Sequence, residues 1–324
     1  MLSSEIFAIE NDAQFQETAL KVFKHQFENN TVYRSFCDLL YKHPSDVNTL
    51  EEIPFLPISF FKSHRIVSNG QNPEAVFVSS GTTGQQTSKH YVTDLSLYET
   101  SFCRTFAHFY GNIKDYVVIG LLPSYLERNN ASLVYMVNHF ITQSEHPQSG
   151  FYLNELDALT TLLKTLDKNG QKVLLIGVSF ALLDLVEHAS FSLHNTVVME
   201  TGGMKGRRKE MIREELHDVL KKGFGVEKIH SEYGMTELLS QAYSKGNGIF
   251  ECPPWMRVLT REPEDAFSFV KAKTGGVNVI DLANFNSCAF LATQDLGVVY
   301  DDNRFEIIGR FDQSDIRGCN LMVL

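Results

Sequence analysis

Apolar side chains recur at helical spacing near the start of the chain. Phe15, Ala19 and Val22 lie three or four positions apart within residues 12–28, which is the spacing of an amphipathic helix with one buried face. The pattern predicts a helix over residues 12–28 with Asp12 as its candidate N-terminal cap.

A second helix is predicted to follow Thr31. The helical pattern then stops at residues 53–57, where Pro54 and Pro57 each remove a backbone donor and disfavour a helical conformation of the preceding residue. We expect this segment to be a connecting loop.

Short β-branched apolar runs alternate with longer amphipathic stretches over most of the middle of the chain. Strands are predicted at 75–78, 116–121, 172–178 and 196–199, and helices at 94–109, 131–142, 154–168, 179–189 and 207–222. Regular alternation of this kind indicates an α/β fold in which helices and a sheet form layers.

The pattern changes after residue 257. Short strands separated by turns are predicted at 277–282, 288–292, 296–300 and 304–308, without a convincing helix. We therefore divide the chain into an α/β core with N-terminal helices, residues 1–256, and a small β-rich subdomain, residues 257–324. Since no repeat or flexible linker is found, this boundary is expected to be a packed one.

Charge and composition exclude several classes of protein. The formal net charge of the 324 residues is −10 and no basic stretch stands out, so nucleic acid is an unexpected partner. The first residues lack an export signal, and no apolar run approaches the roughly 20 residues that span a bilayer. The five cysteines form no CxxC pair, which argues against a disulfide framework and a zinc site. We expect a cytoplasmic protein with reduced thiols.

The densest local signal is a loop of small and hydroxyl-bearing residues after the first predicted strand of the α/β region: Ser79, Ser80, Gly81, Thr82, Thr83 and Gly84. Successive backbone N–H groups in such a loop can point at an anion, and hydroxyls can donate to phosphate oxygens. A nucleoside triphosphatase P-loop is excluded because no lysine follows at the required spacing. An ordinary hairpin turn of the same composition remains an alternative.

Later motifs carry groups that suit a nucleotide. Tyr233-Gly234-Met235-Thr236-Glu237 supplies an aromatic face for a base, a hydroxyl, and a carboxylate suited to Mg²⁺. Asp295, within Thr293-Gln294-Asp295-Leu296-Gly297, is placed at a tight turn where it can accept from both ribose hydroxyls, and Arg310 can add a donor. Each motif alone is also compatible with a plain turn.

The order of these motifs resembles that of the adenylate-forming superfamily, whose members join a carboxylate to ATP as an acyl-AMP. The resemblance covers residues 75–318 and includes Gly202-Gly203, which is similar to the family's adenine-side turn, and Pro253–Val258. It implies that the chain uses ATP and Mg²⁺: residues 79–84 hold the β- and γ-phosphates, Glu237 holds the metal, Thr236 donates to the α-phosphate and Asp295 fixes the ribose.

Two departures narrow the resemblance. The family's glycine-rich loop continues into Pro-Lys, whereas here the first lysine is Lys89. Typical members also continue for about a hundred residues beyond the Gly-Arg-x-Asp hinge into a mobile C-terminal domain. This chain stops at Leu324, so we expect that domain to be absent.

The ending Asp315-Ile316-Arg317-Gly318-Cys319-Asn320-Leu321 resembles that of the acyl-protein synthetase family, named for the luciferase-associated enzyme that activates fatty acids. This resemblance implies that the acyl group passes from AMP to Cys319 and then to a partner, either a reductase or a carrier protein. A structural role for Cys319 is the alternative at that position. For the whole chain the alternatives are an acyl-CoA or aryl-CoA ligase core that needs a separate domain, and a non-catalytic nucleotide-binding or partner-binding module.

Overall fold

The structure is a computed structural model that describes residues 2–79, 86–123, 130–152, 155–202 and 211–311. A helical layer opens the chain, with α1 (Leu2–Ile6), α2 (Asp12–Asn29), α3 (Thr31–Leu39) and the short α4 (Phe60–Ser63). The predicted helices at 12–28 and after Thr31 are confirmed. The predicted cap is wrong by one residue, because it is the side chain of Asn11 that accepts from the amide of Gln14.

A parallel half of the main sheet follows, in the spatial order β5, β4, β6, β7, β8. Its strands are β4 (Val117–Leu121), β5 (Gly150–Phe151), β6 (Val173–Gly177), β7 (Thr196–Thr201) and β8 (His230–Tyr233), and the helices between and before them are α5 (Leu95–Tyr110), α6 (Ser132–Ser144), α7 (Leu156–Lys168), α8 (Ser179–His188) and α9 (Arg213–Phe224). Every residue of β4 and β6 is buried, which is typical of parallel strands covered on both faces. The predicted α/β layering is confirmed.

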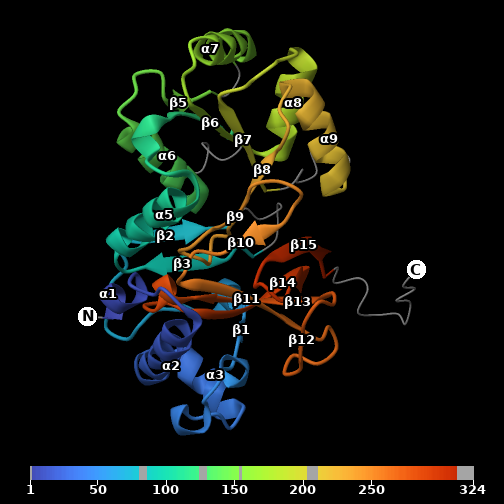
Figure 1. Cartoon of the computed structure of the whole chain (residues 1–324). Coiled ribbons are helices and arrows are strands. Elements are labelled where there is room, and N and C mark those ends of the chain that lie inside the picture. The colour runs from blue at the N-terminus through green and yellow to red at the C-terminus, as the bar shows by residue number, and fades with distance from the viewer. Residues whose placement is uncertain (1, 80–85, 124–129, 153–154, 203–210, 312–324) are drawn as a thin grey trace.

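The same sheet continues as an antiparallel half beyond β8. Its strands are β9 (Ala242–Ser244), β10 (Phe250–Glu251), β11 (Met256–Arg261), β12 (Phe269–Val270), β13 (Gly275–Asp281), β14 (Phe290–Val299) and β15 (Phe305–Arg310). Together with β1 (Leu56–Pro57), which pairs with β14, the two halves form one 13-stranded sheet in the described part of the chain. Figure 1 shows α7, α8 and α9 at one end of the molecule, beside β6 and β7, and α2 and α3 at the other, beside β1. The division of the chain at residue 256 stays a prediction.

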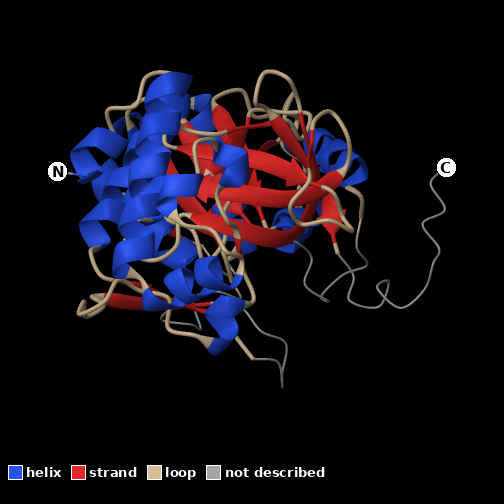
Figure 2. Cartoon of the chain, turned by 90° about the horizontal axis from the view of Figure 1, so that it is seen from below, coloured by secondary structure: helices blue, strands red, loops and turns tan. Residues whose placement is uncertain are grey.

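The hairpin that carries the glycine-hydroxyl loop is a separate two-stranded sheet, β2 (Ala75–Val78) and β3 (Lys89–Val92). Its antiparallel register pairs Val78 with Lys89, so residues 79–88 connect the two strand ends. Seen from below, a large group of helices lies to one side of the red strands (Figure 2).

Within the described ranges no helix is both long enough and apolar enough to cross a membrane.

Two local predictions are wrong. The expected loop at 53–57 ends in a short strand, β1 (Leu56–Pro57), which runs parallel to β14. The strands expected at 288–292 and 296–300 are one continuous strand, β14, so Asp295 lies inside a strand and not at a tight turn. The ladder to β15 shifts register between Leu296 and Gly297. A Cβ on Gly297 would clash with the carbonyl oxygen of Glu306. This glycine therefore allows β14 and β15 to lie close together, whereas the sequence suggested that it forms a turn.

A buried glutamine on α2 ties the helical layer to the end of the 3₁₀ helix η4 (Leu282–Asn284). The Gln26 side chain is fully buried, and its amide nitrogen donates to the carbonyls of Asn284, Phe285 and Ser287 at 3.2, 3.1 and 3.1 Å. Its carbonyl oxygen accepts from the amide of Ala289 at 3.2 Å. One side chain thus satisfies four backbone groups of a turn that lies more than 250 positions away in sequence.

Replacing Gln26 by leucine keeps the approximate size of this side chain but removes the hydrogen-bond partner of the Phe285 carbonyl and of the Ala289 amide. The Asn284 carbonyl still accepts from the Ser287 amide, and the Ser287 carbonyl still accepts from the Asn30 side chain. We expect Gln26→Leu to lower the free energy of unfolding by about 2 kcal/mol or more in urea titrations. The matched control is Gln16→Leu on the exposed face of the same helix, where a change within about 0.5 kcal/mol is expected. Equal effects of the two substitutions would contradict a structural role for Gln26.

Two acidic side chains lie next to each other near the carboxyl ends of β7 and β8. Glu200 pairs in register with Ser231, and Thr201 pairs with Glu232 and donates to its carboxylate at 2.5 Å. Burial raises the pKa of Glu232 from its ordinary value of 4.5 to about 7, and the negative charge of Glu200 acts in the same direction. The Thr201 hydroxyl opposes this rise in the pKa.

This raised pKa makes stability depend on pH in a definite direction. The folded chain keeps a proton on Glu232 that the unfolded chain releases above pH 4.5. The contribution of Glu232 to the free energy of unfolding is therefore full below pH 4.5 and is lost as pH rises through 7. We expect Glu232→Gln, which is neutral at every pH, to raise Tm more at pH 8 than at pH 5. Glu251→Gln on the surface is the control. A Tm difference for Glu232→Gln that is the same at both pH values would refute this assignment.

Candidate nucleotide-binding site

The predicted site residues divide into those that the structure describes and those that it does not. Ser80–Gly84, Gly203 and Cys319 lie outside the described residues, so nothing is said of their placement. The described ones come from elements that are far apart along the chain. They are Ser79 after β2 of the hairpin and, in the main sheet, Gly202 after β7, Tyr233 at the end of β8, Gly234, Thr236 and Glu237 after it, Asp295 in β14 and Arg310 at the end of β15.

Asp295 joins three of these elements. Its carboxylate, 5 % exposed, accepts from the Tyr233 hydroxyl at 2.9 Å and from Nε of Arg310 at 2.9 Å. Its own amide donates to the hydroxyl of Thr293. A carboxylate has about four lone-pair sites, so these two contacts leave acceptor capacity for ribose hydroxyls. The interior position of Asp295 in β14 is therefore compatible with the predicted role, although the local backbone is not the one expected.

The Tyr233 ring is 9 % exposed and lies against two phenylalanine rings. Phe250 and Phe305 pack edge-on to it, with ring centroids 5.9 and 5.6 Å away. These contacts fix the plane of the ring while its hydroxyl is held by Asp295. The role of Tyr233 in stacking on a base stays a prediction.

Glu237 lies at the centre of the cluster and is 6 % exposed. Burial raises the pKa of its carboxyl, while a hydrogen bond from the Ser88 side chain and the positive charges of Arg310 and Lys62 oppose that rise. The carboxylate is thus costly to keep charged. Added positive charge beside it would favour the charged form.

Ser88 connects Glu237 to the base of the glycine-hydroxyl loop. The Ser88 amide donates to the Ser79 hydroxyl oxygen at 2.9 Å, and the Ser79 amide donates to the Ser88 carbonyl at 3.0 Å. Direct hydrogen bonds and close charges therefore run from Ser79 through Ser88, Glu237, Arg310 and Asp295 to Tyr233. The motifs that the sequence places in order along the chain are brought together in space.

Two residues that the sequence analysis did not single out contact the main chain beside Glu237. His90 of β3 lies 2.8 Å from the carbonyl oxygen of Thr236, and the Asn284 amide donates to the carbonyl of Glu237 at 2.8 Å. Ser88 and His90 are two positions apart, which in an extended segment places their side chains on one face. That spacing was the available signal for the pair, whereas nothing in the sequence around Asn284 marks it.

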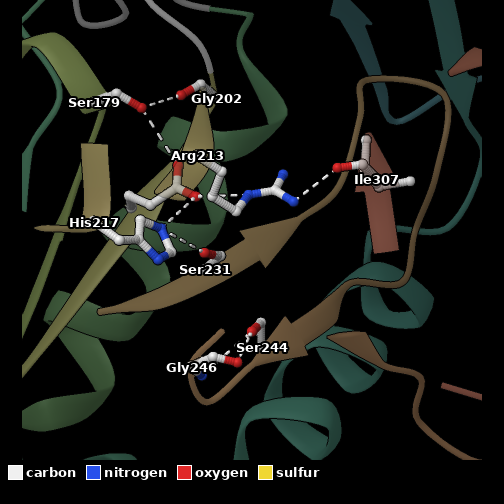
Figure 3. A network of polar contacts seen from close by, with 9 residues as sticks. Ser179, Gly202, Arg213, His217, Ser231, Ser244, Gly246 and Ile307 are labelled. Atoms are coloured by element: carbon white, nitrogen blue, oxygen red, sulfur yellow. Dashed lines mark hydrogen bonds and ion pairs between the residues drawn. The ribbon is translucent and has the colours of Figure 1, made fainter. Parts of the chain in front are cut away.

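A second polar network lies under the turn at Gly202. The Ser179 hydroxyl donates to the Gly202 carbonyl at 2.7 Å and approaches Glu200, which also faces His217 at 3.5 Å. Figure 3 shows the Arg213 side chain reaching from this cluster toward Ile307, whose carbonyl it contacts at 2.8 Å. Because Gly202 has φ +68, it takes a conformation that favours glycine. The network links β7, α9 and β15 beneath the predicted adenine-side turn.

The carboxylate of Glu237 is chemically suited to Mg²⁺, and its role as a metal ligand stays a prediction. Among the described residues no group of three or more His, Cys, Asp or Glu side chains forms a metal cluster. Mg²⁺ at phosphate-transfer sites is held by one or two carboxylates together with phosphates and water, so a single buried carboxylate is sufficient. The metal would supply positive charge against the phosphates.

Comparison with known proteins shows which family the chain matches. The chain matches, over residues 1–324, the family described as "Acyl-protein synthetase, LuxE". Two relatives bear the name long-chain-fatty-acid–luciferin-component ligase. The Vibrio harveyi protein is 22 % identical over 92 % of this chain and 84 % of its own length, and the Aliivibrio fischeri protein is 23 % identical over 99 % and 91 %.

Solved structures of ligases share the fold. A 2-hydroxyisobutyryl-CoA ligase in complex with 2-HIB-AMP and CoA aligns with a TM-score of 0.66 at 12 % identity, covering 94 % of this chain and 72 % of that one. ATP-bound MatB from Rhodopseudomonas palustris aligns with a TM-score of 0.56 at 17 % identity over 75 % of this chain, which spans about half of MatB, 49 %. At such identities the likeness establishes the fold alone, and it confirms the predicted adenylate-forming core. As the resemblance of residues 315–321 predicted, the chain belongs to the acyl-protein synthetase family.

Proposed function

We propose that this chain activates a long-chain fatty acid with ATP and transfers the acyl group to a thiol. The observation that carries the proposal is the chain of contacts from Ser79 through Glu237 to Asp295 and Tyr233. These contacts bring together the residues predicted to bind the phosphates, the metal and the ribose. The names of the two relatives support a long-chain fatty acid as the substrate.

In the first step a carboxylate oxygen of the fatty acid attacks the α-phosphorus of ATP. The bond between that phosphorus and the oxygen bridging to the β-phosphate breaks, and pyrophosphate leaves with the electron pair. Ser79 and the loop after it hold the β- and γ-phosphates, Asp295 holds the ribose, and Thr236 donates to the α-phosphate. Glu237 would hold Mg²⁺, which when bound would supply positive charge against the phosphates. The step replaces an oxide leaving group by AMP, a far better one.

In the second step a thiolate attacks the carbonyl carbon of the acyl-AMP. The bond from that carbon to the phosphate oxygen breaks, and AMP leaves with the electron pair. Cys319 is the proposed acceptor because it lies in the ending that resembles the family's, with Arg317 as a neighbouring cation that favours the thiolate. The acyl group would then pass to a partner reductase or carrier protein. Such a thiol needs a reducing compartment, which favours the cytoplasm.

Glu237 gives a direct test of the first step. We expect Glu237→Gln to lower the rate of fatty-acid-dependent ATP–pyrophosphate exchange by ~10²-fold, since the neutral amide cannot hold Mg²⁺ at the phosphates. Because burial raises the pKa of this carboxyl, removing its charge should leave Tm unchanged or higher. The surface variant Glu262→Gln is the control. Full exchange activity in Glu237→Gln would remove the metal assignment.

Cys319 gives a test of the second step. After incubation with ATP, Mg²⁺ and a mixture of long-chain fatty acids, we expect intact-mass spectrometry to find a hydroxylamine-sensitive acyl adduct on the wild-type chain and none on Cys319→Ser. The control is Cys103→Ser, because burial raises the pKa of the Cys103 thiol to about 11 and makes it a poor nucleophile. Acyl-CoA formed on addition of CoA, without any adduct, would instead identify a CoA ligase.

A further inference from the structure

A buried histidine and a buried asparagine contact two successive carbonyl groups in the Tyr-Gly-Met-Thr-Glu motif. His90 is fully buried in β3, with Nδ1 2.8 Å from the Thr236 carbonyl oxygen and Nε2 3.0 Å from Oδ1 of Asn284. Asn284 is 1 % exposed, and its amide nitrogen donates to the carbonyls of Glu237 at 2.8 Å and Cys288 at 3.0 Å.

We propose that His90 and Asn284 are positioning residues for adenylation, holding the main chain of Thr236 and Glu237 so that their side chains meet the phosphates. The inference rests on the proposed function, because it assigns to these two residues the alignment of a motif that the proposal makes catalytic. Neither His90 nor Asn284 touches the reacting atoms in this assignment.

Both ring nitrogens of His90 face oxygen atoms that only accept, because Nδ1 faces the Thr236 carbonyl and Nε2 faces Oδ1 of Asn284. A neutral imidazole carries one N–H and donates to one of the two; in the proposed arrangement the hydrogen is on Nδ1 and is donated to the Thr236 carbonyl. The Asn284 amide nitrogen faces two carbonyls, which sets the orientation of that side chain. The contact of His90 with Thr236 is one through which the hairpin acts on the motif.

The hairpin acts on the motif through a second contact as well. Ser88, two positions before His90, hydrogen-bonds the Glu237 side chain, and it is paired with Ser79 at the base of the glycine-hydroxyl loop. The hairpin thus contacts residues 236–237 once at the main chain and once at the carboxylate. Two contacts from one segment restrict the orientation of residues 236–237 more than a single contact would.

Asn284 is itself anchored from another direction. Gln26 of α2 donates to the Asn284 carbonyl at 3.2 Å, and the same side chain holds the turn that follows. If His90 only filled space, an apolar side chain would serve equally well, because a buried imidazole is costly unless it is hydrogen-bonded. The polar contacts that converge on Thr236 and Glu237 therefore support a role for His90 and Asn284 in aligning these two residues.

Two amide variants of His90 separate alignment from packing. The shorter His90→Asn places its NH₂ group near the position of Nδ1 and can still donate to Thr236, whereas His90→Gln reaches toward Asn284 and leaves the Thr236 carbonyl unpaired. We expect His90→Gln to lower kcat for ATP–pyrophosphate exchange ~10- to 100-fold, as for other supporting contacts around a metal site, with little change in KM for ATP. His90→Asn should recover most of kcat.

A second measurement keeps the test independent of activity. Hydrogen–deuterium exchange followed by mass spectrometry should show faster exchange in residues 234–241 for His90→Gln than for His90→Asn, without any nucleotide. His139→Asn and His139→Gln, on α6, form the control pair and should behave alike in both measurements.

The outcomes separate the two proposals. Equal exchange of residues 234–241 in the two His90 variants, or a loss of kcat that follows Tm alone, overturns the positioning role. Absence of fatty-acid-dependent exchange activity in the wild-type chain overturns the proposed function. In that case a difference between the variants in deuterium exchange would still establish that His90 orders the motif.

Discussion

The site depends on one constraint: where β8 ends at Tyr233, the chain leaves the sheet ladder but stays half-buried over residues 234–236 and buried from Glu237 onward. Every carbonyl and amide group of such a segment needs a partner, because a buried unpaired backbone group is costly. Side chains supply the hydrogen-bond partners that neighbouring strands no longer provide. His90 meets the Thr236 carbonyl, Asn284 meets the Glu237 carbonyl, and Asp281 accepts from the amides of Leu239 and Ser240 at 2.7 and 2.9 Å.

This constraint explains why the site lies at the change in strand direction. β8 is parallel to β7 and antiparallel to β9, so the sheet switches direction at the strand that ends in Tyr233. Open α/β sheets bind ligands beyond the carboxyl ends of their strands, where neighbouring connections diverge. Gly202, after β7, and Gly234, after β8, mark those strand ends here, and the antiparallel half brings Asp295 and Arg310 to the same place.

The sequence was sufficient to predict most of the helices and strands and the set of motifs. It was less sufficient to predict the local backbone geometry of individual segments. Period-3.6 and β-branched patterns identified α2 and the parallel strands β4, β6 and β7 because these elements bury regular faces. The loop expected at residues 53–57 and the turn expected around Asp295 failed for a common reason. Both segments are stabilised by pairing with strands that are far away in sequence, and no local pattern reports such pairing.

The same reasoning separates the site residues that could be found from those that could not. Ser79, Tyr233, Glu237, Asp295 and Arg310 lie in short motifs whose chemistry can be read locally, and the structure joins them by direct contacts and close charges. His90, Asn284 and Gln26 act on backbone groups of distant segments, so their roles exist only once the chain has folded. A lone buried histidine or amide has no sequence signature.

Net charge is a poor guide to what such a site binds. The chain carries a formal charge of −10, which would repel ATP if charge acted over the whole molecule. At physiological ionic strength, however, charges are screened over about 8 Å, so the groups in the site decide. Arg310 and Lys62 face the Glu237 carboxylate, and a divalent cation arriving with the nucleotide would add to them. An acidic protein can therefore bind a compact anion at one point, whereas an extended polyanion would need basic residues along its whole length.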